Sequence, residues 1–379
     1  MHLLSNLRPG AGSEPIDILP RQAASVRASN GCLRRALAAH LDPEAGSPFW
    51  LERQAELGFS LLEEIRTVED LPRLQAFPRE ALLERPLSDF VPRSLWQDRR
   101  KLVLAESGGT TGRPTRSVFT RSEFRLGFGD PFLAVSRDRQ FPAGLGWLFV
   151  GPSGPHVIAA AAKLLARLHD SLEPFSVDLD PRWARAQEPG SLGDRLYRRQ
   201  ILGQALDLIA REAPGVLFAT PPLSLELGRL LSGPQRRAVR GVHLGGMAIG
   251  IEDYLEIREL YDQAVVLPGY GNSMFGLLMG GSDPEEAHLD YFPLPGRLHV
   301  QVVSEASGVP DLERPLGPGE TGRVVLNRLD RSCFLPNLVE RDRATVACAG
   351  PRALRQGLHP LGLRDPHPVA EREARRGLY

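Results

Sequence analysis

Short apolar runs alternate with amphipathic stretches through the middle of this sequence. The apolar runs are residues 145–150, 174–179, 215–220, 238–244 and 264–268. Each has the length of a buried strand and ends at a turn or loop that contains glycine or proline. Between the runs, apolar residues recur at helical spacing over 157–168 and 197–211. Strands that alternate with helices are typical of a mostly parallel sheet flanked by helices, so the predicted fold class is α/β.

The pattern differs on both sides of this region. The first 30 residues are polar and contain proline and glycine, and a helical pattern then runs from about 49 to 83. After Arg297, apolar runs at 298–303 and 324–326 flank a turn, which predicts a β-hairpin. The expected organisation is an N-terminal arm (1–45), an α/β core (46–296), a small β subdomain (297–348) and a short C-terminal tail (349–379).

The charge balance argues against some classes of partner. Lysine plus arginine and aspartate plus glutamate both number 46, so the formal net charge is zero. This balance disfavours nucleic acid or an anionic membrane surface as the main partner. The three cysteines have no CxxC spacing, and the start of the chain lacks the apolar core of a signal peptide. We therefore expect a soluble, cytoplasmic protein.

The segment from Ala105 to Thr115, Ala-Glu-Ser-Gly-Gly-Thr-Thr-Gly-Arg-Pro-Thr, carries the most specific chemistry. Its glycines let the backbone approach an anion, and its hydroxyl and N–H groups can donate hydrogen bonds to phosphate. It is not a Walker-type loop, because no lysine follows its last glycine, Gly112. Clusters of serine, glycine and threonine also form ordinary turns, and the loop alone leaves this alternative open.

Three further segments follow this loop in an order and spacing that resemble the adenylate-forming enzyme superfamily. Residues 107–115 are similar to that family's phosphate loop. Thr115 stands where the phenylacetate–coenzyme A ligase branch has a threonine, so the loop resembles that branch. Residues 245–248 (Gly-Gly-Met-Ala) look like the segment along adenine, and 270–273 (Tyr-Gly-Asn-Ser) match the family's Tyr-Gly-x-Thr/Ser. Residues 336–342 resemble the segment whose aspartate holds the ribose, with a spacing most similar to the truncated bacterial acyl-protein synthetases.

This resemblance implies the large N-terminal domain of these enzymes and a set of site residues. It implies phosphate binding by Ser107, Gly108, Gly109, Thr110, Thr111 and Gly112. It implies adenine and ribose binding by Gly245, Gly246, Met247, Tyr270, Gly271, Asn272 and Asp342. It implies catalytic roles for Thr111, Ser273 and His156, and a substrate pocket formed by Trp147, Phe149, His156 and His243. For each pocket residue, a structural role is the alternative.

The sequence departs from the family pattern in two places. Met274 stands where the family has a glutamate that ligates magnesium, and a thioether is a poor ligand for a hard cation. The metal ligands are therefore not identified, and magnesium is expected only if another carboxylate, such as Glu106, substitutes. The family's C-terminal domain carries a catalytic lysine, whereas no lysine follows Asp342. We therefore expect no full C-terminal lid domain.

The resemblance implies an ATP-dependent enzyme that joins a carboxylic acid, aromatic or fatty, to AMP and releases pyrophosphate. The acyl group would pass to a thiol (coenzyme A, a carrier protein or a partner enzyme) or to an amine, in a biosynthetic pathway. The alternative is a catalytically degenerate nucleotide-binding subunit that scaffolds or regulates a biosynthetic complex. Cys348 is a candidate acyl carrier, with an ordinary thiol as the favoured alternative. A homodimer is one assembly that fits these functions.

Overall fold

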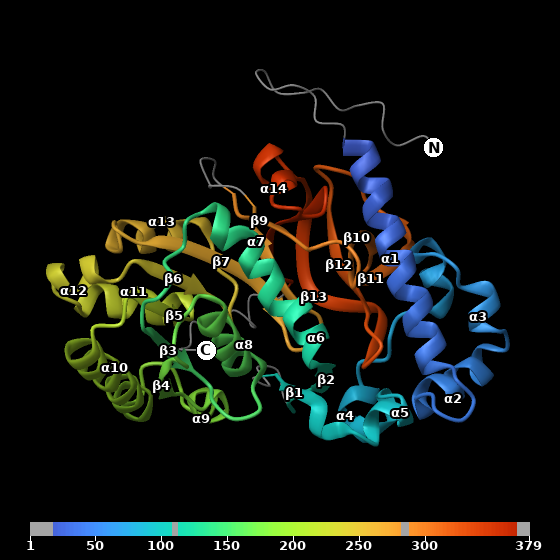
Figure 1. Ribbon diagram of the computed structural model, residues 1–379, viewed down its shortest axis with the longest axis horizontal. Coiled ribbons are helices and arrows are strands. Elements are labelled where there is room, and N and C mark those ends of the chain that lie inside the picture. Colours follow the sequence, from blue (N-terminus) through green and yellow to red (C-terminus); the bar gives the residue numbers. More distant parts are fainter. Residues whose placement is uncertain (1–17, 108–112, 282–287, 370–379) are drawn as a thin grey trace.

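One large sheet of 12 strands forms the centre of the chain (Figure 1). The structure is a computed structural model that describes residues 18–107, 113–281 and 288–369. Strands β1 (Leu102–Glu106) and β2 (Arg116–Thr120) form a separate antiparallel hairpin. The α/β fold class predicted from the sequence is confirmed.

Five neighbouring strands of the large sheet are parallel. They are β4 (Phe175–Asp178), β3 (Trp147–Gly151), β5 (Val216–Ala219), β6 (Gly241–Leu244) and β7 (Val265–Asn272), in this spatial order. Each lies within or overlaps one of the apolar runs that predict buried strands. Alternate residues of a strand face opposite sides of a sheet, and in β3, β5 and β6 both sides are buried, because helices cover both faces.

The helices divide between these two faces. Trp147 and Phe149 of β3 pack on the side of α7 (Asp130–Asp138) and α8 (Val157–Leu168). Leu148 and Val150 pack on the other side, which α10 (Leu192–Glu212), α11 (Pro221–Leu230) and α13 (Ile251–Leu260) cover. The short helices α9 (Pro181–Ala186) and α12 (Gly233–Ala238) lie in the connections.

The other strands of the large sheet pair antiparallel. Continuing outward from β7, they are β8 (Gly276–Gly280), β9 (Asp290–Phe292), β14 (Leu361–Pro368), β13 (Phe334–Cys348), β12 (Thr321–Leu329), β10 (Leu298–Ala306) and β11 (Val309–Pro315). The strands expected at 298–303 and 324–326 do pair, with Val300 opposite Leu326, and β11 intervenes between them in the sequence. The expected β subdomain and α/β core therefore share one continuous sheet.

Residues 361–368, within the expected C-terminal tail, form a strand inside this sheet. Strand β14 lies between β13 and β9, and an ion pair from Arg364 to Asp290 of β9 joins its side chain to its neighbour. Helix α14 (Pro351–Arg355) connects β13 to β14. The sequence of β14 contains arginine, aspartate, histidine and two prolines, so its apolar content alone does not indicate a strand.

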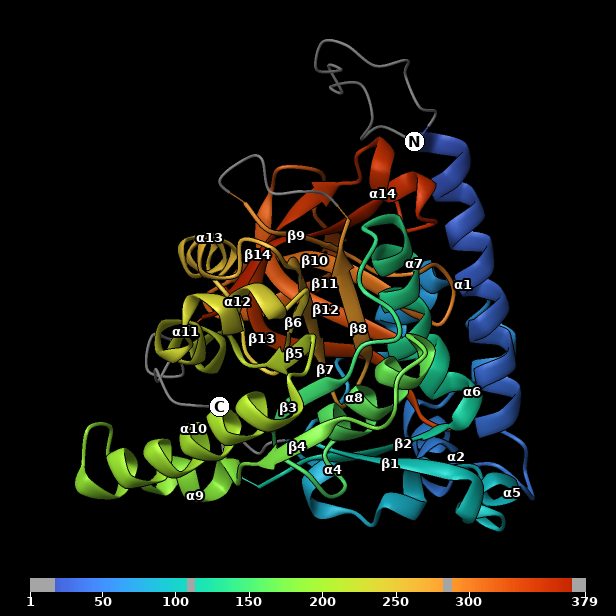
Figure 2. The ribbon, with the colours of Figure 1, turned by 60° about the vertical axis from the view of Figure 1, so that its left-hand side comes forward.

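Part of the expected N-terminal arm is also a core element. Residues Ile18–His40 form helix α1, whose Leu33, Ala36 and Leu37 are buried. These residues have the i, i+3, i+4 spacing of a single apolar stripe. The stripe is narrow on an otherwise polar helix, which explains why the composition suggested a loose arm. Figure 2 shows α1 lying along the outside of the antiparallel strands, and it contacts β12 and β13.

Several short helices complete the described chain. Between α1 and β1 they are α2 (Pro48–Leu57), α3 (Leu61–Glu64), η1 (Val68–Leu74), α4 (Ala81–Glu84), η2 (Leu87–Phe90), α5 (Arg93–Trp96) and η3 (Arg99–Lys101). The helical pattern expected over 49–83 is thus divided, first at Gly58, whose φ of 74° ends α2. After β2, α6 (Arg121–Phe124), the π-helix η4 (Arg125–Gly129) and α7 follow without interruption. In the described part of the chain, no helix is long and apolar enough to cross a membrane.

The burial of Leu37 gives a test of the position of α1. We expect Leu37→Ala to lower the free energy of unfolding by about 2–5 kcal/mol, because it opens a cavity in a packed core. The exposed Arg34 on the same helix is the matched control, and Arg34→Ala should change stability by about 0.5 kcal/mol or less. Urea unfolding followed by circular dichroism measures both. An equal, small effect of the two substitutions would mean that α1 does not pack on the sheet.

Candidate functional site

The hairpin β1–β2 carries the predicted phosphate loop, and its neck is closed by hydrogen bonds. The backbone N–H of Ser107 donates to the carbonyl of Thr115 at 3.0 Å. The N–H and hydroxyl of Thr115 donate to the Ser107 hydroxyl at 2.9 and 3.1 Å. Ser107 and Thr115 therefore fix the base of the loop. The predicted phosphate ligands Gly108, Gly109, Thr110, Thr111 and Gly112 lie outside the described residues.

Glu106, the last residue of β1, contacts the residues that precede helix α8. The backbone N–H of Glu106 donates to the carbonyl of Pro155 at 2.9 Å, and Glu106 and His156 form a parallel β-bridge. The Glu106 side chain is buried and pairs with Arg116 at 2.9 Å. These contacts place the end of β1 beside His156, which directly precedes α8.

His156 is a buried imidazole with a free ring nitrogen. The residue is 5% exposed, and its Nδ1 has no hydrogen-bond partner among the described residues. Burial lowers the pKa of His156 below its ordinary value, although the charge of Glu106 opposes this shift. The side chain is therefore neutral at neutral pH, and its Nδ1 is an unused polar atom next to the end of β1.

The predicted adenine and ribose segments meet directly at the end of β7. The Tyr270 hydroxyl donates to the Asp342 carboxylate at 2.6 Å. Two residues later in β7 and two residues earlier in β13, the Asn272 amide donates to the Glu340 carboxylate at 3.2 Å. Side chains two positions apart on a strand face the same side, so both strands turn matching pairs of residues toward each other. Three strands, β14, β9 and β8, lie between β13 and β7 in the sheet order, so the curvature of the sheet brings these side chains together.

The electrostatics of this meeting point keep Tyr270 protonated. Burial, and then the negative charges of Asp342 and Glu340, raise the pKa of Tyr270 well above its ordinary value. The phenol is consequently a hydrogen-bond donor throughout the physiological range. Glu340 itself is buried and also pairs with Arg79 at 3.3 Å.

Glu340 and Arg79 lie at the candidate site but were not predicted from the sequence as site residues. Arg79 lies just before α4, about 260 residues from its partner, and nothing local marks such a pairing. Glu340 stands two residues before Asp342, and this i, i+2 spacing of two carboxylates on one strand was the available signal.

Ser273 joins the hairpin to the turn that follows β7. Its carbonyl accepts a hydrogen bond from the Ser117 hydroxyl of β2 at 2.6 Å. The Ser273 hydroxyl is buried and has no hydrogen-bond partner among the described residues. Two predicted catalytic residues, His156 and Ser273, therefore flank the same hairpin with unused polar atoms.

A buried group of charges lies beneath this turn. The Asp330 carboxylate accepts from Arg297 Nε and Nη2 at 2.9 and 2.6 Å and from Arg328 Nε at 2.6 Å. The Arg328 side chain is 1% exposed and that of Asp330 is 2% exposed. Burial opposes ionisation, but the two guanidiniums hold the pKa of Asp330 below its usual value. Two cations share one anion, so the group carries an excess positive charge.

Backbone carbonyls accept further hydrogen bonds from the two guanidiniums. Arg328 donates to the carbonyl of Met274 at 3.0 Å and to that of Val118 on β2. Arg297 donates to the carbonyl of Phe275 at 2.6 Å. The buried charges therefore bind the turn after Ser273 to the hairpin that carries the predicted phosphate loop.

The residues at the expected magnesium position do not fit a metal held by the protein. The Met274 side chain is 2% exposed and packs in the hydrophobic core. The alternative ligand Glu106 is engaged by Arg116. The described residues contain no group of three or more histidine, cysteine, aspartate and glutamate side chains that could hold a metal ion. Magnesium prefers carboxylate and water oxygens; Met274 has no such oxygen, and the Oε2 atom of Glu106 is paired with Arg116.

Three residues expected in the substrate pocket are packed in the core. Trp147, Phe149 and His243 are each at most 2% exposed. The His243 ring lies against Phe218, with ring centroids 4.4 Å apart, and its Nδ1 lies 2.9 Å from the Leu267 carbonyl. These side chains fill the space between the sheet and α7–α8, so their prediction as pocket residues is not supported. His156 alone of the four lies at the strand ends.

A cavity lies next to the predicted adenine segment. It has a volume of about 240 Å³ and is lined by residues 248–251 and 365–367. The first group continues from Gly245, Gly246 and Met247, and Gly246 has a φ of 87° that favours glycine. The second belongs to β14, where Pro368 is paired with Asp342. The cavity thus lies between the predicted adenine segment and the strand of the predicted ribose aspartate.

Gly271 is required by the close approach of two strands. A Cβ atom at this position would lie 2.2 Å from the carbonyl oxygen of Gly276 on β8. Any larger residue would push β8 away from β7 and displace the neighbouring Tyr270 and Asn272. Its role in the described structure is therefore to let β7 and β8 pair closely.

Cys348, the candidate acyl carrier, is partly buried at the end of β13. Burial raises the pKa of the Cys348 thiol above its ordinary value, and Arg364 opposes the shift. A raised pKa lowers the thiolate fraction at neutral pH. The ordinary-thiol alternative is thus the better supported one.

Comparison with known structures identifies the fold. The sequence matches no protein-family model and no curated protein. The structure is similar to 2-hydroxyisobutyryl-CoA ligase in complex with 2-HIB-AMP and CoA, with a TM-score of 0.65 and 16% identity. That match covers 94% of this chain and 71% of the ligase. An open conformation of the same ligase gives a TM-score of 0.63 at 16% identity, covering 94% of this chain and 78% of the ligase.

These likenesses define the class of fold. The chain has the fold of the adenylate-forming enzymes, as the sequence resemblance implied. The confirmed strand positions and the meeting of Tyr270 with Asp342 agree with the order of motifs on which that resemblance depended.

The burial of His243 predicts a pH-dependent stability. Burial lowers the pKa of His243 to about 4, against about 6.5 in an unfolded chain. Between these values the unfolded state takes up a proton that the folded state does not. The contribution of this group to stability is therefore complete above pH 6.5 and decreases by about 1.4 kcal/mol per pH unit as the pH falls toward 4.

We expect His243→Asn, whose amide can replace Nδ1 at the Leu267 carbonyl, to remove this dependence. The slope of the free energy of unfolding against pH, measured by urea unfolding between pH 6.5 and 4, should be shallower than in the wild-type chain. Equal slopes in the two proteins would mean that His243 is protonated in the folded state.

Proposed function

We propose that this protein activates a carboxylic acid with ATP, forming an acyl-adenylate and releasing pyrophosphate. The observation that carries the proposal is the pair of contacts between β7 and β13, Tyr270 with Asp342 and Asn272 with Glu340. They join residues 72 and 68 positions apart, in two segments that the resemblance assigns to one nucleoside. The ligase with a similar fold is described with 2-HIB-AMP and CoA, which agrees with this chemistry.

The chain's own residues would bind the nucleoside at the strand ends. The Asp342 carboxylate would accept hydrogen bonds from the ribose hydroxyls while the Tyr270 hydroxyl keeps its oxygen atoms oriented. The cavity lined by residues 248–251 and 365–367 would receive the base. The loop that begins at Ser107 would bind the phosphates, with Thr110 and Thr111 as donors.

The reaction requires no nucleophile from the protein. An oxygen of the substrate carboxylate bonds to the α-phosphorus, the bond to the β-phosphate oxygen breaks, and pyrophosphate leaves with the electron pair. The neutral His156 and the Ser273 hydroxyl flank the hairpin with unused polar atoms, and they would orient the carboxylate. The enzyme's contribution is therefore position and preorganised charge stabilisation.

The second step would transfer the acyl group to a thiol or an amine. The acceptor atom bonds to the acyl carbon, the acyl C–O bond to phosphate breaks, AMP leaves with the electron pair, and the acceptor's proton passes to solvent. No step is assigned to a protein-held metal, because Met274 offers no oxygen ligand and the Glu106 carboxylate is paired with Arg116.

A second function is favoured by one observation. The buried Met274 at the expected magnesium position fits a nucleotide-binding subunit that has lost catalysis and that scaffolds or regulates a biosynthetic complex. Such a subunit would bind ATP at the same site but would exchange no pyrophosphate with any acid.

The test measures ATP binding and ATP–pyrophosphate exchange in the same protein. We expect Asp342→Asn to weaken ATP binding about 10- to 150-fold, since it removes a charge-assisted hydrogen bond of about 1.5–3 kcal/mol. Asp311→Asn, on the exposed strand β11, is the matched control and should bind ATP like the wild-type chain.

Exchange is then measured across a panel of aromatic and fatty acids. An acid-dependent exchange that Asp342→Asn abolishes supports acyl-adenylate formation. ATP binding without exchange for any acid supports the non-catalytic subunit. If Asp342→Asn binds ATP as tightly as Asp311→Asn, the nucleoside does not occupy this site and both functions are excluded.

A further inference from the structure

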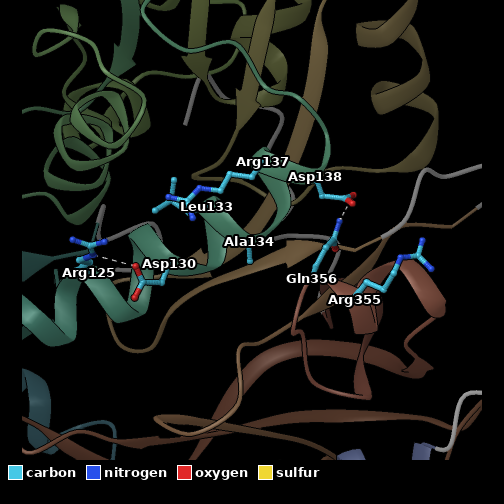
Figure 3. A pocket seen from close by; sticks show the side chains of 8 residues that line it. All are labelled: Arg125, Asp130, Leu133, Ala134, Arg137, Asp138, Arg355 and Gln356. Atoms are coloured by element: carbon cyan, nitrogen blue, oxygen red, sulfur yellow. Dashed lines mark hydrogen bonds and ion pairs between the residues drawn. The ribbon is translucent and has the colours of Figure 1, made fainter.

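A cavity of about 410 Å³ lies between α7 and the α14 region, but its lining does not suit the organic part of an acid. Figure 3 shows mostly charged and amide side chains around it. Asp130 pairs with Arg125 at 3.1 Å, and the Gln356 amide donates to Asp138 at 2.8 Å. A hydrocarbon placed here would displace water from charged groups and offer them no hydrogen bond, which is unfavourable. The apolar surface at the ends of the parallel strands is the better place for it.

Glycines stand at the ends of β3 and β6 on the face that α8 covers. Phe149 of β3 is paired with Phe218 of β5, and Phe218 is paired with His243 of β6. Two residues further along the same side are Gly151, the last residue of β3, and Gly245, which directly follows β6. Because glycine has no side chain, the face leaves space at this edge of the sheet.

Two phenyl rings fill the space that these glycines leave. A Cβ atom on Gly151 would lie 2.6 Å from Cζ of Phe149, and a Cβ atom on Gly245 would lie 3.2 Å from Cε2 of Phe218. The ring centroids of Phe149 and Phe218 are 5.4 Å apart, and each of the two residues is 2% exposed. Both rings therefore extend toward the strand ends and close this face of the sheet up to its edge.

The same rings adjoin a group that would orient the carboxylate. Ile158 stands two residues after His156, and its Cδ1 would lie 3.9 Å from a Cβ atom on Gly245. Ile158 is buried and packs in the same core cluster as Phe149 and Phe218. An acid whose carboxylate lies at His156 would therefore have Ile158 and Phe218 as the apolar surface for its organic part.

We propose that Phe149 and Phe218 restrict the substrate to acids with a short organic part, such as acetate or propionate, and exclude long-chain and aromatic acids. The proposal rests on the proposed function, because it concerns the acid that is activated. A packed interior gives little space to additional atoms. One methylene group in an apolar pocket changes selectivity by about 10- to 200-fold. Of the aromatic and fatty acids considered above, only the shortest fatty acids would fit.

The test is the binding of stable acyl-adenylate mimics, 5′-O-(N-acylsulfamoyl)adenosines, measured by isothermal titration calorimetry. This measurement requires no turnover. The acyl groups are acetyl, propionyl, hexanoyl and benzoyl. We expect the wild-type chain to bind the acetyl or propionyl mimic at least about tenfold more tightly than the hexanoyl and benzoyl mimics. Pyrophosphate exchange with the four free acids should follow the same order.

Truncation of one ring should relax this selectivity. We expect Phe218→Ala to bind the hexanoyl mimic at least about tenfold more tightly than the wild-type chain does, with ATP binding unchanged. Phe218→Leu removes less volume from the core, so it serves if Phe218→Ala does not fold, and it should shift the preference in the same direction.

Phe141→Ala is the matched control. A Cβ atom on Gly241, the first residue of β6, would lie 2.7 Å from Cζ of Phe141. The Phe141 ring therefore fills space at the opposite end of the same face, and it belongs to the same core cluster as Phe218. Phe141→Ala removes the same atoms from this cluster and should leave the order of the mimics unchanged.

The proposal is overturned if the wild-type chain binds the hexanoyl or benzoyl mimic as tightly as the acetyl and propionyl mimics. It is also overturned if Phe218→Ala and Phe141→Ala change the selectivity equally. If ATP and every mimic fail to bind, the proposed function fails and the size restriction fails with it. Binding in the expected order without pyrophosphate exchange would support the size restriction and contradict the proposed activation.

Discussion

Two buried guanidinium groups that share the carboxylate of Asp330 hold together the segments around the candidate site. Arg328 spans from β2 to the turn after β7, and Arg297 supports the next residue of that turn. Removing one partner of such a group typically costs about 3–5 kcal/mol, because the others remain buried and uncompensated. The hairpin that carries the loop and the turn that carries Ser273 are therefore fixed relative to each other by the core.

The curvature of the large sheet brings a second pair of segments together, independently of these arginines. Strands β7 and β13 are not neighbours in the sheet, yet their side chains meet through Tyr270 with Asp342 and Asn272 with Glu340. Strand β14 makes this possible, because it joins the antiparallel strands to β9 and thereby to the parallel half. A segment that looks like a tail in the sequence thus determines whether the two halves of the site face each other.

The sequence predicted what depends on local periodicity and on motif order. The five parallel strands and the start and end of α8 follow from apolar runs and helical spacing, and the family resemblance implied that Tyr270 and Asp342 serve one nucleoside, without indicating the hydrogen bond between them. It could not reveal features that depend on distant partners. The strand β14 contains few apolar residues, α1 has a narrow buried stripe, and Arg79 reaches Glu340 across 261 positions. The burial of Trp147, Phe149 and His243 was likewise invisible, because core and pocket residues have the same composition.

Met274 is part of the core. The absence of a metal ligand at this position is therefore not an isolated change. Its side chain is packed among apolar residues and its carbonyl is occupied by Arg328. A glutamate in the same place would bury a carboxylate unless the turn moved, and the turn is held by two arginines and by the Ser117 hydroxyl. The surrounding structure therefore excludes a side-chain metal ligand here, while the excess positive charge of Arg297, Arg328 and Asp330 lies directly behind the turn. The charge that these three residues hold behind the turn is consequently positive and fixed by the core.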